Sequence, residues 1–429
     1  MWRFKPKATT SCAEEAPDGS VIGRRLGGEA ALPLTANGDL VLPWETLNRH
    51  LLILGASGMG KTETSLRIAE QLALRTDAQI FYLDGKGNRA GAVRFGALMA
   101  ACGRRTRVFP NEPFAGWRGD WNAVMNRLLE VIAYAEMGPA AYYRDQAKVV
   151  LALVCRDPAG PPQSSEELLA RMDLEYLIRT HPGRRGIDSL SATSVRDIRG
   201  RYEAFFASLG TALDGEWGWD DTEAGYFLLD PLALRENAAG AASLLFTDFG
   251  HYISRRKDPG RPCVLFIDEF SSIARRDDIA FVTEQARSFN VGLVLIPQSL
   301  SGLGDEAQRD RILDSVETVI AHACRLPDRV SALGGERKVA ELTHRFGEGV
   351  GEGEGHSQLE LRPKVEPQEL RTLAIGDAWV MRRGQASKIR VERAGAGAKF
   401  RLPAAQDLHP APTPCDSSPP KELGYLDGI

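Results

Sequence analysis

The stretch that decides the fold is "LLILGASGMGKT", residues 51–62, where a short apolar run ends in a glycine-rich loop. Its second part, "GASGMGKT", matches the phosphate-loop (Walker A) pattern G-x-x-x-x-G-K-[ST]. The four apolar residues before the loop predict a buried strand, and "KTETSLRIAEQLALRT" after it has the apolar spacing of an amphipathic helix. Strand, loop and helix in this order predict a nucleoside triphosphate site.

The glycines let backbone N–H groups wrap the phosphates, and the N-terminus of the following helix adds a favourable dipole. Lys61 is expected to reach the β- and γ-phosphates, and the Thr62 hydroxyl to bind Mg²⁺. ATP and Mg²⁺ are therefore the predicted cofactors. The predicted nucleotide contacts in this region are Gly55, Ala56, Ser57, Gly58, Met59, Gly60, Lys61, Thr62 and Glu63.

A second apolar strand, "CVLFIDEF" at 263–270, ends in two acids and provides the expected Walker B partner. Asp268 would hold Mg²⁺, and Glu269 would orient or deprotonate the attacking water. Simple phosphate-loop kinases need no dedicated water activator, so the second acid favours hydrolysis of ATP.

Two further catalytic candidates flank the strand "VGLVLIP" at 291–297. Gln298 follows this strand and would sense the γ-phosphate or the water, or it would only cap the strand. Arg287 closes the helix expected near 278–289. It would stabilise transition-state charge in a neighbouring subunit's site, or it would be a solvated cation at a helix C-terminus.

The segment "FYLDGKGN", residues 81–88, ends the strand that follows the phosphate-loop helix. Its position predicts that it lies at the active edge of the sheet. Two alternatives remain open for Asp84 and Lys86. They line the nucleotide edge, or they pair with each other across the turn.

The alternation of strands and helices predicts an α/β fold, a RecA-like P-loop NTPase with a parallel sheet flanked by helices. Helix-like segments with few β-branched runs predict an all-α domain inserted into it. The predicted divisions are an irregular segment at 1–30, an ATPase domain at 31–117 and 223–396, the insertion at 118–222, and a proline-rich disordered tail at 397–429. A glycine- and acid-rich mobile loop is expected at 345–357.

The formal net charge of −4 argues against a protein that coats nucleic acid non-specifically, but it allows a local basic channel. The insertion contains the stretch of the chain with the strongest excess of positive charge. It has six arginines and only two acids, Asp188 and Asp197. The arginines are Arg179, Arg184, Arg185, Arg196, Arg199 and Arg201. They would contact DNA phosphates or form a solvated helical face. The same alternatives hold for Lys388, Arg390 and Arg393.

The six cysteines lack metal-ligand spacing and suit a reducing cytosol. No run approaches eighteen consecutive apolar residues. We therefore expect a cytoplasmic protein, recruited to the inner face of the membrane by a partner if it acts there.

The order of these motifs resembles the conjugative coupling proteins of type IV secretion (the TraG/TraD group), which are relatives of the FtsK and HerA DNA pumps. The resemblance covers about residues 20 to 395. It rests on the phosphate loop, "YLDGKGN", the helical block, "IDEF", "ARSFNVGLVLIPQSLSGL" and "PQELRTLAIGDAWVMRRG".

The resemblance implies a ring-shaped homohexamer with ATP sites between subunits and single-stranded DNA in a central pore. Lys61 and Thr62 match the family's phosphate-loop pair, and Asp268 and Glu269 match its metal and water-activating acids. Gln298 falls on the sensor position, and Arg287 falls where the interfacial arginine is expected. Family members usually begin with transmembrane helices, so we expect a soluble variant or a domain cut from a longer protein.

The leading hypothesis is an ATPase that moves single-stranded DNA, or a relaxase–DNA complex, towards a type IV secretion channel. One alternative is a HerA- or FtsK-like translocase in repair, segregation or defence, although such proteins usually lack a large α-insertion here. Another is a recruitment platform for secreted proteins, in which ATP gates assembly.

Overall fold

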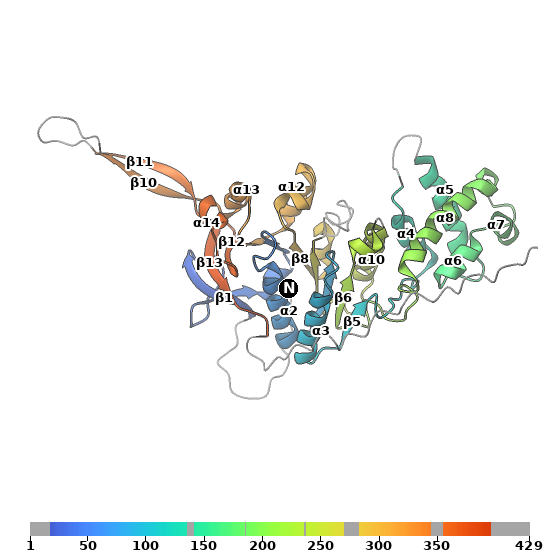
Figure 1. The fold of residues 1–429 in the computed structure, drawn as a ribbon, viewed down its shortest axis with the longest axis horizontal. Coiled ribbons are helices and arrows are strands. Elements are labelled where there is room, and N and C mark those ends of the chain that lie inside the picture. The colour runs from blue at the N-terminus through green and yellow to red at the C-terminus, as the bar shows by residue number, and fades with distance from the viewer. Residues whose placement is uncertain are drawn as a thin grey trace, which may run out of the picture.

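The computed structural model describes residues 18–134, 141–184, 186–235, 237–269, 283–344 and 355–395. An eleven-stranded sheet crosses the molecule in the order β2-β1-β13-β12-β9-β3-β8-β7-β4-β6-β5 (Figure 1). Its seven strands from β9 to β5 are parallel. They are β3 (Leu51–Leu54), β4 (Gln79–Asp84), β5 (Thr106–Phe109), β6 (Ala224–Leu228), β7 (Cys263–Asp268), β8 (Val291–Ile296) and β9 (Thr318–Ala321). The predicted α/β fold is confirmed.

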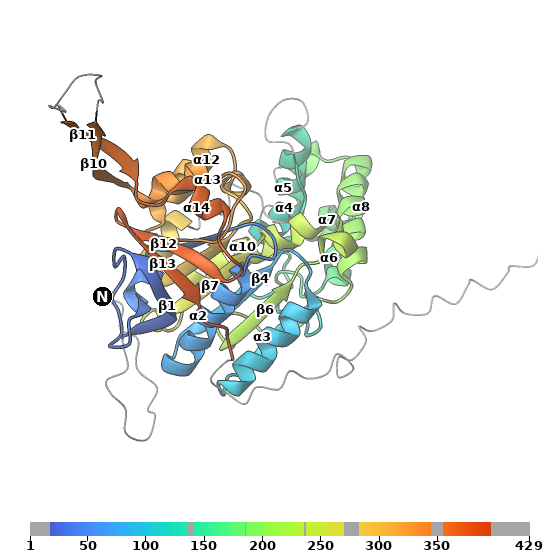
Figure 2. The ribbon, with the colours of Figure 1, turned by 60° about the vertical axis from the view of Figure 1, so that its left-hand side comes forward.

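Helices cover both faces of this sheet because alternate side chains of each strand point to opposite faces. Ile53 and Tyr82 pack in one apolar cluster with α2 (Lys61–Arg75) and α3 (Arg89–Ala101). Phe81 and Leu83 pack in the other, with α10 (Asn237–Ser254) and α12 (Glu306–Ser315). Figure 2 shows α2 and α3 side by side in front of the parallel strands. Strands that are apolar on both faces are typical of a parallel sheet.

Four antiparallel strands extend one edge of the sheet. They are β12 (Asp377–Arg382), β13 (Gln385–Val391), β1 (Gly19–Gly28) and β2 (Asp39–Pro43). The prediction of an irregular segment through residue 30 is wrong for Gly19–Gly28. This strand contains four glycines and no apolar alternation, and it is specified by pairing with two neighbours. Residues 1–17 lie outside the described residues.

A two-stranded ribbon, β10 (Glu336–His344) and β11 (Gly355–Pro363), projects from the body at the end opposite the α4–α8 helices (Figures 1 and 2). The loop predicted at 345–357 is therefore too long at its end, because residues 355–357 pair with β10. The start of β11 was not predicted because it follows a glycine-rich stretch and itself begins with a glycine. Residues 345–354 and the predicted tail at 397–429 lie outside the described residues.

Short helices connect the main elements. They are α1 (Trp44–Leu47), α9 (Pro231–Leu234), α13 (Pro327–Ser331) and α14 (Pro367–Arg371). The helix predicted near 278–289 begins in residues that are not described, whereas residues 283–286 are α-helical. Its described end includes a 3₁₀ turn at Arg287–Phe289. Among the described residues, none of the helices is both long and apolar enough to cross a membrane.

The helices α4 (Trp121–Val131), α5 (Ala141–Cys155), α6 (Ser165–Arg171), α7 (Leu174–Thr180) and α8 (Ala192–Leu209) gather at one end of the molecule (Figure 1). The domain limits remain a prediction. Helix α4 is joined to α10 by a buried ion pair, in which Arg127 Nη1 lies 2.5 Å from Asp248 Oδ1. Trp219 Nε1 donates to the other Asp248 oxygen at 2.9 Å. Burial raises the pKa of Asp248, and the Arg127 charge opposes this rise.

We expect Arg127→Ala to lower the free energy of unfolding by about 3–5 kcal/mol, because it leaves the Asp248 carboxylate buried without a cation. Urea denaturation would measure the change. Arg255→Ala is the matched control, since Arg255 pairs with Asp120 where both side chains are about half exposed. Its cost should stay below about 1 kcal/mol. Equal costs for the two variants would contradict the assigned role of the buried pair.

Candidate nucleotide-binding site

The phosphate loop connects β3 to α2 at the carboxyl-terminal edge of the parallel sheet. The Lys61 side chain folds back over the loop, and its ammonium donates to the carbonyls of Gly55 at 2.5 Å and Ala56 at 3.1 Å. Burial, and then the positive charge of Lys86, lower the pKa of Lys61. Two lysines therefore face the same small region, as an anionic ligand requires.

His322 directly follows the neighbouring strand β9 and packs against the phosphate loop. A Cβ atom on Gly55 would lie 2.7 Å from His322 Cβ, so the loop passes too close for any other residue. The His322 N–H donates to Leu54 O at 2.8 Å. One step further along the same pair of segments, the backbone N–H of Ala56 donates to Ala323 O at 2.7 Å and is therefore engaged within the chain.

The His322 ring connects α2 to β12. Its Nδ1 lies 2.9 Å from the Asp377 carbonyl, which can only accept, so Nδ1 carries the proton. Nε2 then accepts from the Thr64 hydroxyl at 2.9 Å. Burial lowers the pKa of His322 to about 4, and the ring is neutral at pH 7. Sequence reasoning missed His322, whose only signal was one polar residue in the apolar run "TVIAHAC".

The two predicted acids and Gln298 come together in the structure. Strand β8 lies between β3 and β7, so its end is adjacent to both the phosphate loop and the acids. Gln298 Nε2 donates to Glu269 Oε2 at 3.0 Å. Glu269 adopts the left-handed conformation with φ 55°, a backbone strain of the kind found at functional sites. Gln298 therefore contacts the proposed base directly and does more than cap the strand.

Asp268 and Asp84 face each other in register at the ends of β7 and β4. Asp84 does not pair with the Lys86 side chain. It accepts from the backbone N–H groups of Lys86 at 2.8 Å and Asn88 at 3.0 Å, and from the Tyr226 hydroxyl at 2.7 Å. Asp84 therefore fixes the turn that carries Lys86.

Lys86 lines the active edge, as the first of the two sequence alternatives requires. Its Nζ lies 2.9 Å from Asp268 Oδ1 and 3.6 Å from Glu269 Oε2. Burial lowers the pKa of Lys86, but the contact with Asp268 and the charge of Glu269 outweigh it, and the pKa rises. Burial raises the pKa of Asp268, against the Lys86 charge. The ammonium is thus the cation that balances these acids.

Besides Lys61, two predicted nucleotide contacts lie in the first turn of α2. Thr62 is half-buried there. Glu63 is engaged elsewhere, because its Oε2 accepts from Arg94 Nη2 of α3 at 2.7 Å. Glu63 therefore faces the neighbouring helix, and the structure gives no support to its predicted contact with the nucleotide.

Arg287 is the one predicted catalytic residue that lies away from the others. It precedes β8, whereas the phosphate loop follows the parallel strand β3. The two sites therefore lie at opposite ends of the parallel strands. A strand of this length separates them by about 20 Å. Arg287 is exposed at its edge. It is too far from its own chain's phosphate loop to contact the same nucleotide.

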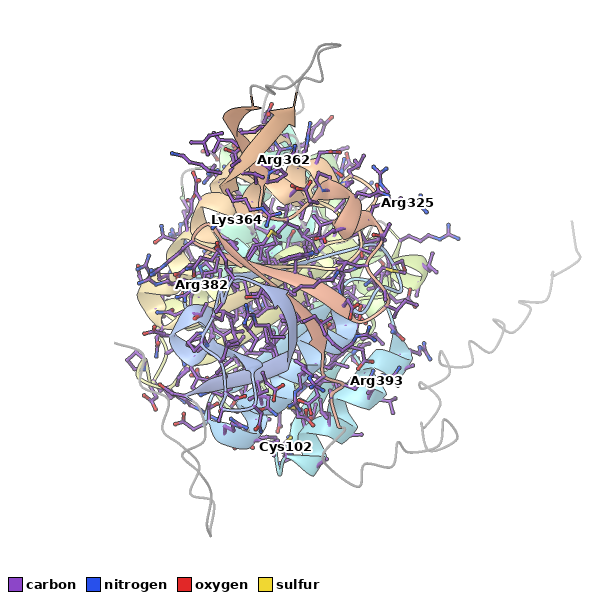
Figure 3. All side chains as sticks on the ribbon, turned by 90° about the vertical axis from the view of Figure 1, so that its left-hand side faces the viewer. Cys102, Arg325, Arg362, Lys364, Arg382 and Arg393 are labelled. Carbon is purple, nitrogen blue, oxygen red and sulfur yellow. The ribbon has the colours of Figure 1, made fainter. Side chains whose placement is uncertain are left out.

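A cavity of about 470 Å³ adjoins the phosphate loop. Ala56, Ser57 and Gln298 contribute to its wall, together with Arg325 and Arg329. Arg325 is exposed and lies at the periphery of the molecule in the view of Figure 3. Sequence reasoning missed both arginines because no motif contains them. A cationic wall next to the loop suits an anionic ligand.

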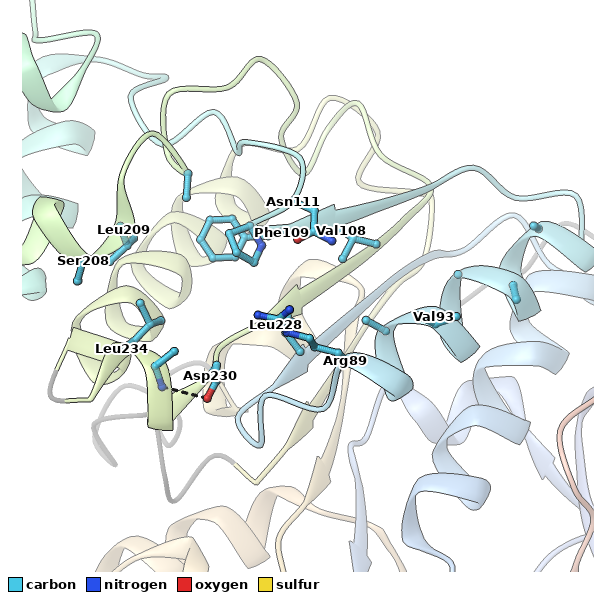
Figure 4. Close-up of a pocket in the computed structure, with 17 residues that line it drawn as sticks. Arg89, Val93, Val108, Phe109, Asn111, Ser208, Leu209, Leu228, Asp230 and Leu234 are labelled. Atoms are coloured by element: carbon cyan, nitrogen blue, oxygen red, sulfur yellow. Dashed lines mark hydrogen bonds between the residues drawn. The ribbon is translucent and has the colours of Figure 1, made fainter. Parts of the chain in front are cut away.

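The other basic residues singled out in the sequence lie elsewhere. Arg390 forms an ion pair with Asp377, whereas Arg393 is exposed (Figure 3). In the α4–α8 region, Arg179, Arg184, Arg196 and Arg201 are exposed, Arg199 is half-buried, and Arg185 lies outside the described residues. A larger cavity of about 590 Å³ between α3, β5 and α9 is mostly apolar (Figure 4).

Comparison with known proteins gives two family matches. Residues 31–116 match the helicase HerA-like C-terminal family, and residues 262–374 match the TraM recognition site of TraD and TraG. An uncharacterized protein of Mycoplasma pneumoniae is 34% identical over 100 residues, which are 22% of this chain. The chain spans 65% of the length of that curated relative.

Solved structures of a coupling protein and of VirB4 share the fold. The unbound bacterial conjugative coupling protein TrwBdeltaN70 has a TM-score of 0.63 at 16% identity, over 86% of this chain and 94% of that chain. The plasmid coupling protein TrwB in complex with ADP and Mg²⁺ has a TM-score of 0.62 at 16% identity, over 93% and 97%. VirB4 of Thermoanaerobacter pseudethanolicus has a TM-score of 0.56 at 14% identity, over 89% and 98%.

The pH dependence of stability should report the buried His322. The unfolded chain takes up a proton near pH 6.5, whereas the folded ring resists protonation down to about pH 4. Stability from this residue is therefore complete above pH 6.5 and is lost as the pH falls towards 4. Between pH 7 and pH 5 the loss amounts to about 2 kcal/mol.

His322→Asn, whose amide N–H replaces the Nδ1 donor, should lose about 2 kcal/mol less over this interval in urea denaturation. The variant should keep the part of the pH-dependent stability loss that comes from His50, because burial lowers the pKa of His50 to about 4 as well. Identical pH profiles for wild type and variant would show that His322 is not held neutral.

Proposed function

We propose that this chain, which belongs to the coupling-protein and HerA/FtsK group of P-loop ATPases, is an ATP-driven DNA translocase. It would move single-stranded DNA, or a relaxase–DNA complex, towards a type IV secretion channel. The observation that carries the proposal is the meeting of the phosphate loop, Asp268, Glu269 and Gln298 at one edge of the sheet. ATP hydrolysis needs these groups together.

The residues at this edge fit ATP and Mg²⁺. Gly55, Gly58 and Gly60 have φ values of 150°, 79° and 115°, which give the loop a backbone that other residues rarely adopt. A carboxylate and a hydroxyl are hard oxygen ligands of the kind Mg²⁺ prefers, so Asp268 and Thr62 would hold the metal. Bound Mg²⁺ would neutralise charge on the phosphate oxygens.

The chain's own groups then account for hydrolysis. Lys61 would hold the β- and γ-phosphates in place. Glu269 would accept a proton from the attacking water while the bond to the leaving ADP breaks. The hydrogen bond from Gln298 fixes the direction of the Glu269 carboxylate. Holding the base in one orientation lowers the entropy cost of reaching the transition state.

The exposed position of Arg287 supports an assembly in which it reaches a neighbouring subunit, and the resemblance to coupling proteins implies a homohexameric ring. If the edge of the sheet that carries Arg287 meets the phosphate-loop edge of the next subunit, each ATP site is completed by its neighbour. The exposed arginines that the sequence analysis singled out in the α4–α8 region are the proposed contacts with DNA phosphates; they are Arg179, Arg184, Arg196 and Arg201. Relaxase and secretion-channel components are the proposed protein partners.

Two other functions are supported by particular matches. The HerA-like match at residues 31–116 supports a translocase in repair, segregation or defence. The match at residues 262–374 is to a region named for recognition of a protein, TraM. It supports the alternative of a recruitment platform whose assembly is gated by ATP.

ATP turnover by the purified chain should rise several-fold with single-stranded DNA. Lys61→Ala should abolish turnover because it removes the cation that holds the phosphates. Glu269→Gln should bind ATP like the wild type but hydrolyse it at least about 100-fold more slowly, because it lacks only the base. Phosphate release and binding of a fluorescent ATP analogue would measure the two properties.

The matched control is Glu63→Gln, which changes an acid of the same region that pairs with Arg94. It should retain most of the turnover. Turnover that ignores DNA, together with tight binding of a protein substrate, would favour the recruitment platform. Persistent hydrolysis by Glu269→Gln would mean that another group activates the water.

Mixing two inactive variants tests whether Arg287 acts in the neighbouring subunit. Arg287→Ala and Glu269→Gln should each be inactive alone, but a mixture should recover turnover. In mixed rings, an intact phosphate-loop site of the first variant meets an intact arginine of the second. Steady-state phosphate release at several mixing ratios would measure the recovery.

A mixture of Lys61→Ala with Glu269→Gln serves as the control, since neither variant supplies an intact phosphate-loop half. It should stay inactive at every ratio. Full activity of Arg287→Ala alone would reduce Arg287 to a solvated cation.

A further inference from the structure

Lys86 occupies the position at which a metal-binding carboxylate needs a cation. Asp268 is only 3% exposed, and its Oδ1 lies 2.9 Å from the Lys86 ammonium. The Glu269 carboxylate lies 3.6 Å from the same ammonium. A buried carboxylate without a partner is costly, so this ammonium stabilises the acidic pair in the absence of any other cation.

The turn that carries Lys86 is held from several sides. Three donors bind the Asp84 carboxylate, among them the buried Tyr226 hydroxyl from β6. Gly87 has a φ of 70°, and a Cβ atom there would lie 2.8 Å from Asp230 Cα. Asn88 then caps α3 by accepting from Gly91 N–H at 3.2 Å. The ammonium is therefore directed at the acids by a built turn.

The same carboxylate is the proposed ligand of Mg²⁺. An ammonium in hydrogen-bond contact with an Asp268 oxygen shields that oxygen from a divalent cation, and two cations so close repel each other. The positive charge of Lys86 also repels that of Lys61 and contributes to lowering the pKa of Lys61. The phosphate site thus has one cation more than it needs once a metal is bound.

We propose that Lys86 is a positioning residue that competes with Mg²⁺ for Asp268 and is exchanged for the metal when Mg²⁺ and nucleotide bind. This inference rests on the ATPase function proposed above. In the metal-free protein, Lys86 holds Asp268 and Glu269 in place. On loading, the ammonium leaves Asp268, and the turn at 84–88 senses that the site is filled.

The test compares full-length wild type with Lys86→Met. Binding of a fluorescent ADP analogue is followed as a function of Mg²⁺ concentration. Because the lost contact belongs only to the metal-free state, the half-saturating Mg²⁺ concentration should fall about three- to tenfold in the variant. Thermal unfolding in EDTA should occur at a lower temperature in the variant, and saturating Mg²⁺ with ADP should close that gap.

Lys86→Arg keeps the positive charge and should retain a half-saturating concentration near that of the wild type. Lys364→Met is the matched control, because it removes a lysine that pairs with Glu29 on the surface, Nζ to Oε2 at 2.6 Å. It should leave the Mg²⁺ dependence unchanged. Tyr226→Phe removes one of the hydrogen-bond donors to Asp84. It should shift the Mg²⁺ dependence in the same direction as Lys86→Met, but by less.

Three outcomes are decisive. An unchanged or higher half-saturating Mg²⁺ concentration in Lys86→Met, with normal nucleotide binding, would overturn the exchange and leave the ATPase proposal standing. A stability gap that persists with Mg²⁺ and ADP would show that Lys86 is a structural residue in both states. Failure of the wild type to bind Mg²⁺ and nucleotide would overturn the proposed function, and the exchange with it.

Discussion

The parallel register of four central strands is the constraint on which the whole site depends. Strands β3, β8, β7 and β4 are neighbours, and all four end at the same edge of the sheet. The phosphate loop, Gln298, the acid pair and the Lys86 turn each follow one of these ends. A shift of one residue in β7 would turn Asp268 to the opposite face of the sheet, because side chains alternate along a strand.

Charge balance is the second condition that this edge must meet. Lys61 and Lys86 face Asp268 and Glu269, and of these four residues only Lys86 is partly exposed. Each charge alone would be costly to bury, whereas two of each sign offset most of the desolvation penalty. The neutral His322 beneath the loop fits this arrangement, because a third cation next to Lys61 would upset the balance.

The sequence predicted the parts of the site that consist of short contiguous motifs. These are the phosphate loop and the strand ending in two acids, whose functional groups lie in consecutive residues. It also predicted that Gln298 follows the next strand along the chain, whereas the position of that strand between β3 and β7 came only from the structure. It could not choose between the alternatives for Lys86, because the choice depends on the pairing of β4 with β7 across almost two hundred residues. The contact of His322 and the pairing of β1 were missed for the same reason.

The two edges of the sheet divide the proposed machinery between neighbouring molecules. One edge carries the groups proposed to hold ATP and activate water, and the other carries Arg287, about 20 Å away along the strands. No rearrangement that keeps the sheet intact can bring both to one nucleotide within one chain. Hydrolysis would then depend on assembly, so that an isolated subunit binds ATP without consuming it. The Lys86 turn adds a condition of the same kind inside the subunit, because its ammonium must yield before a metal can occupy Asp268.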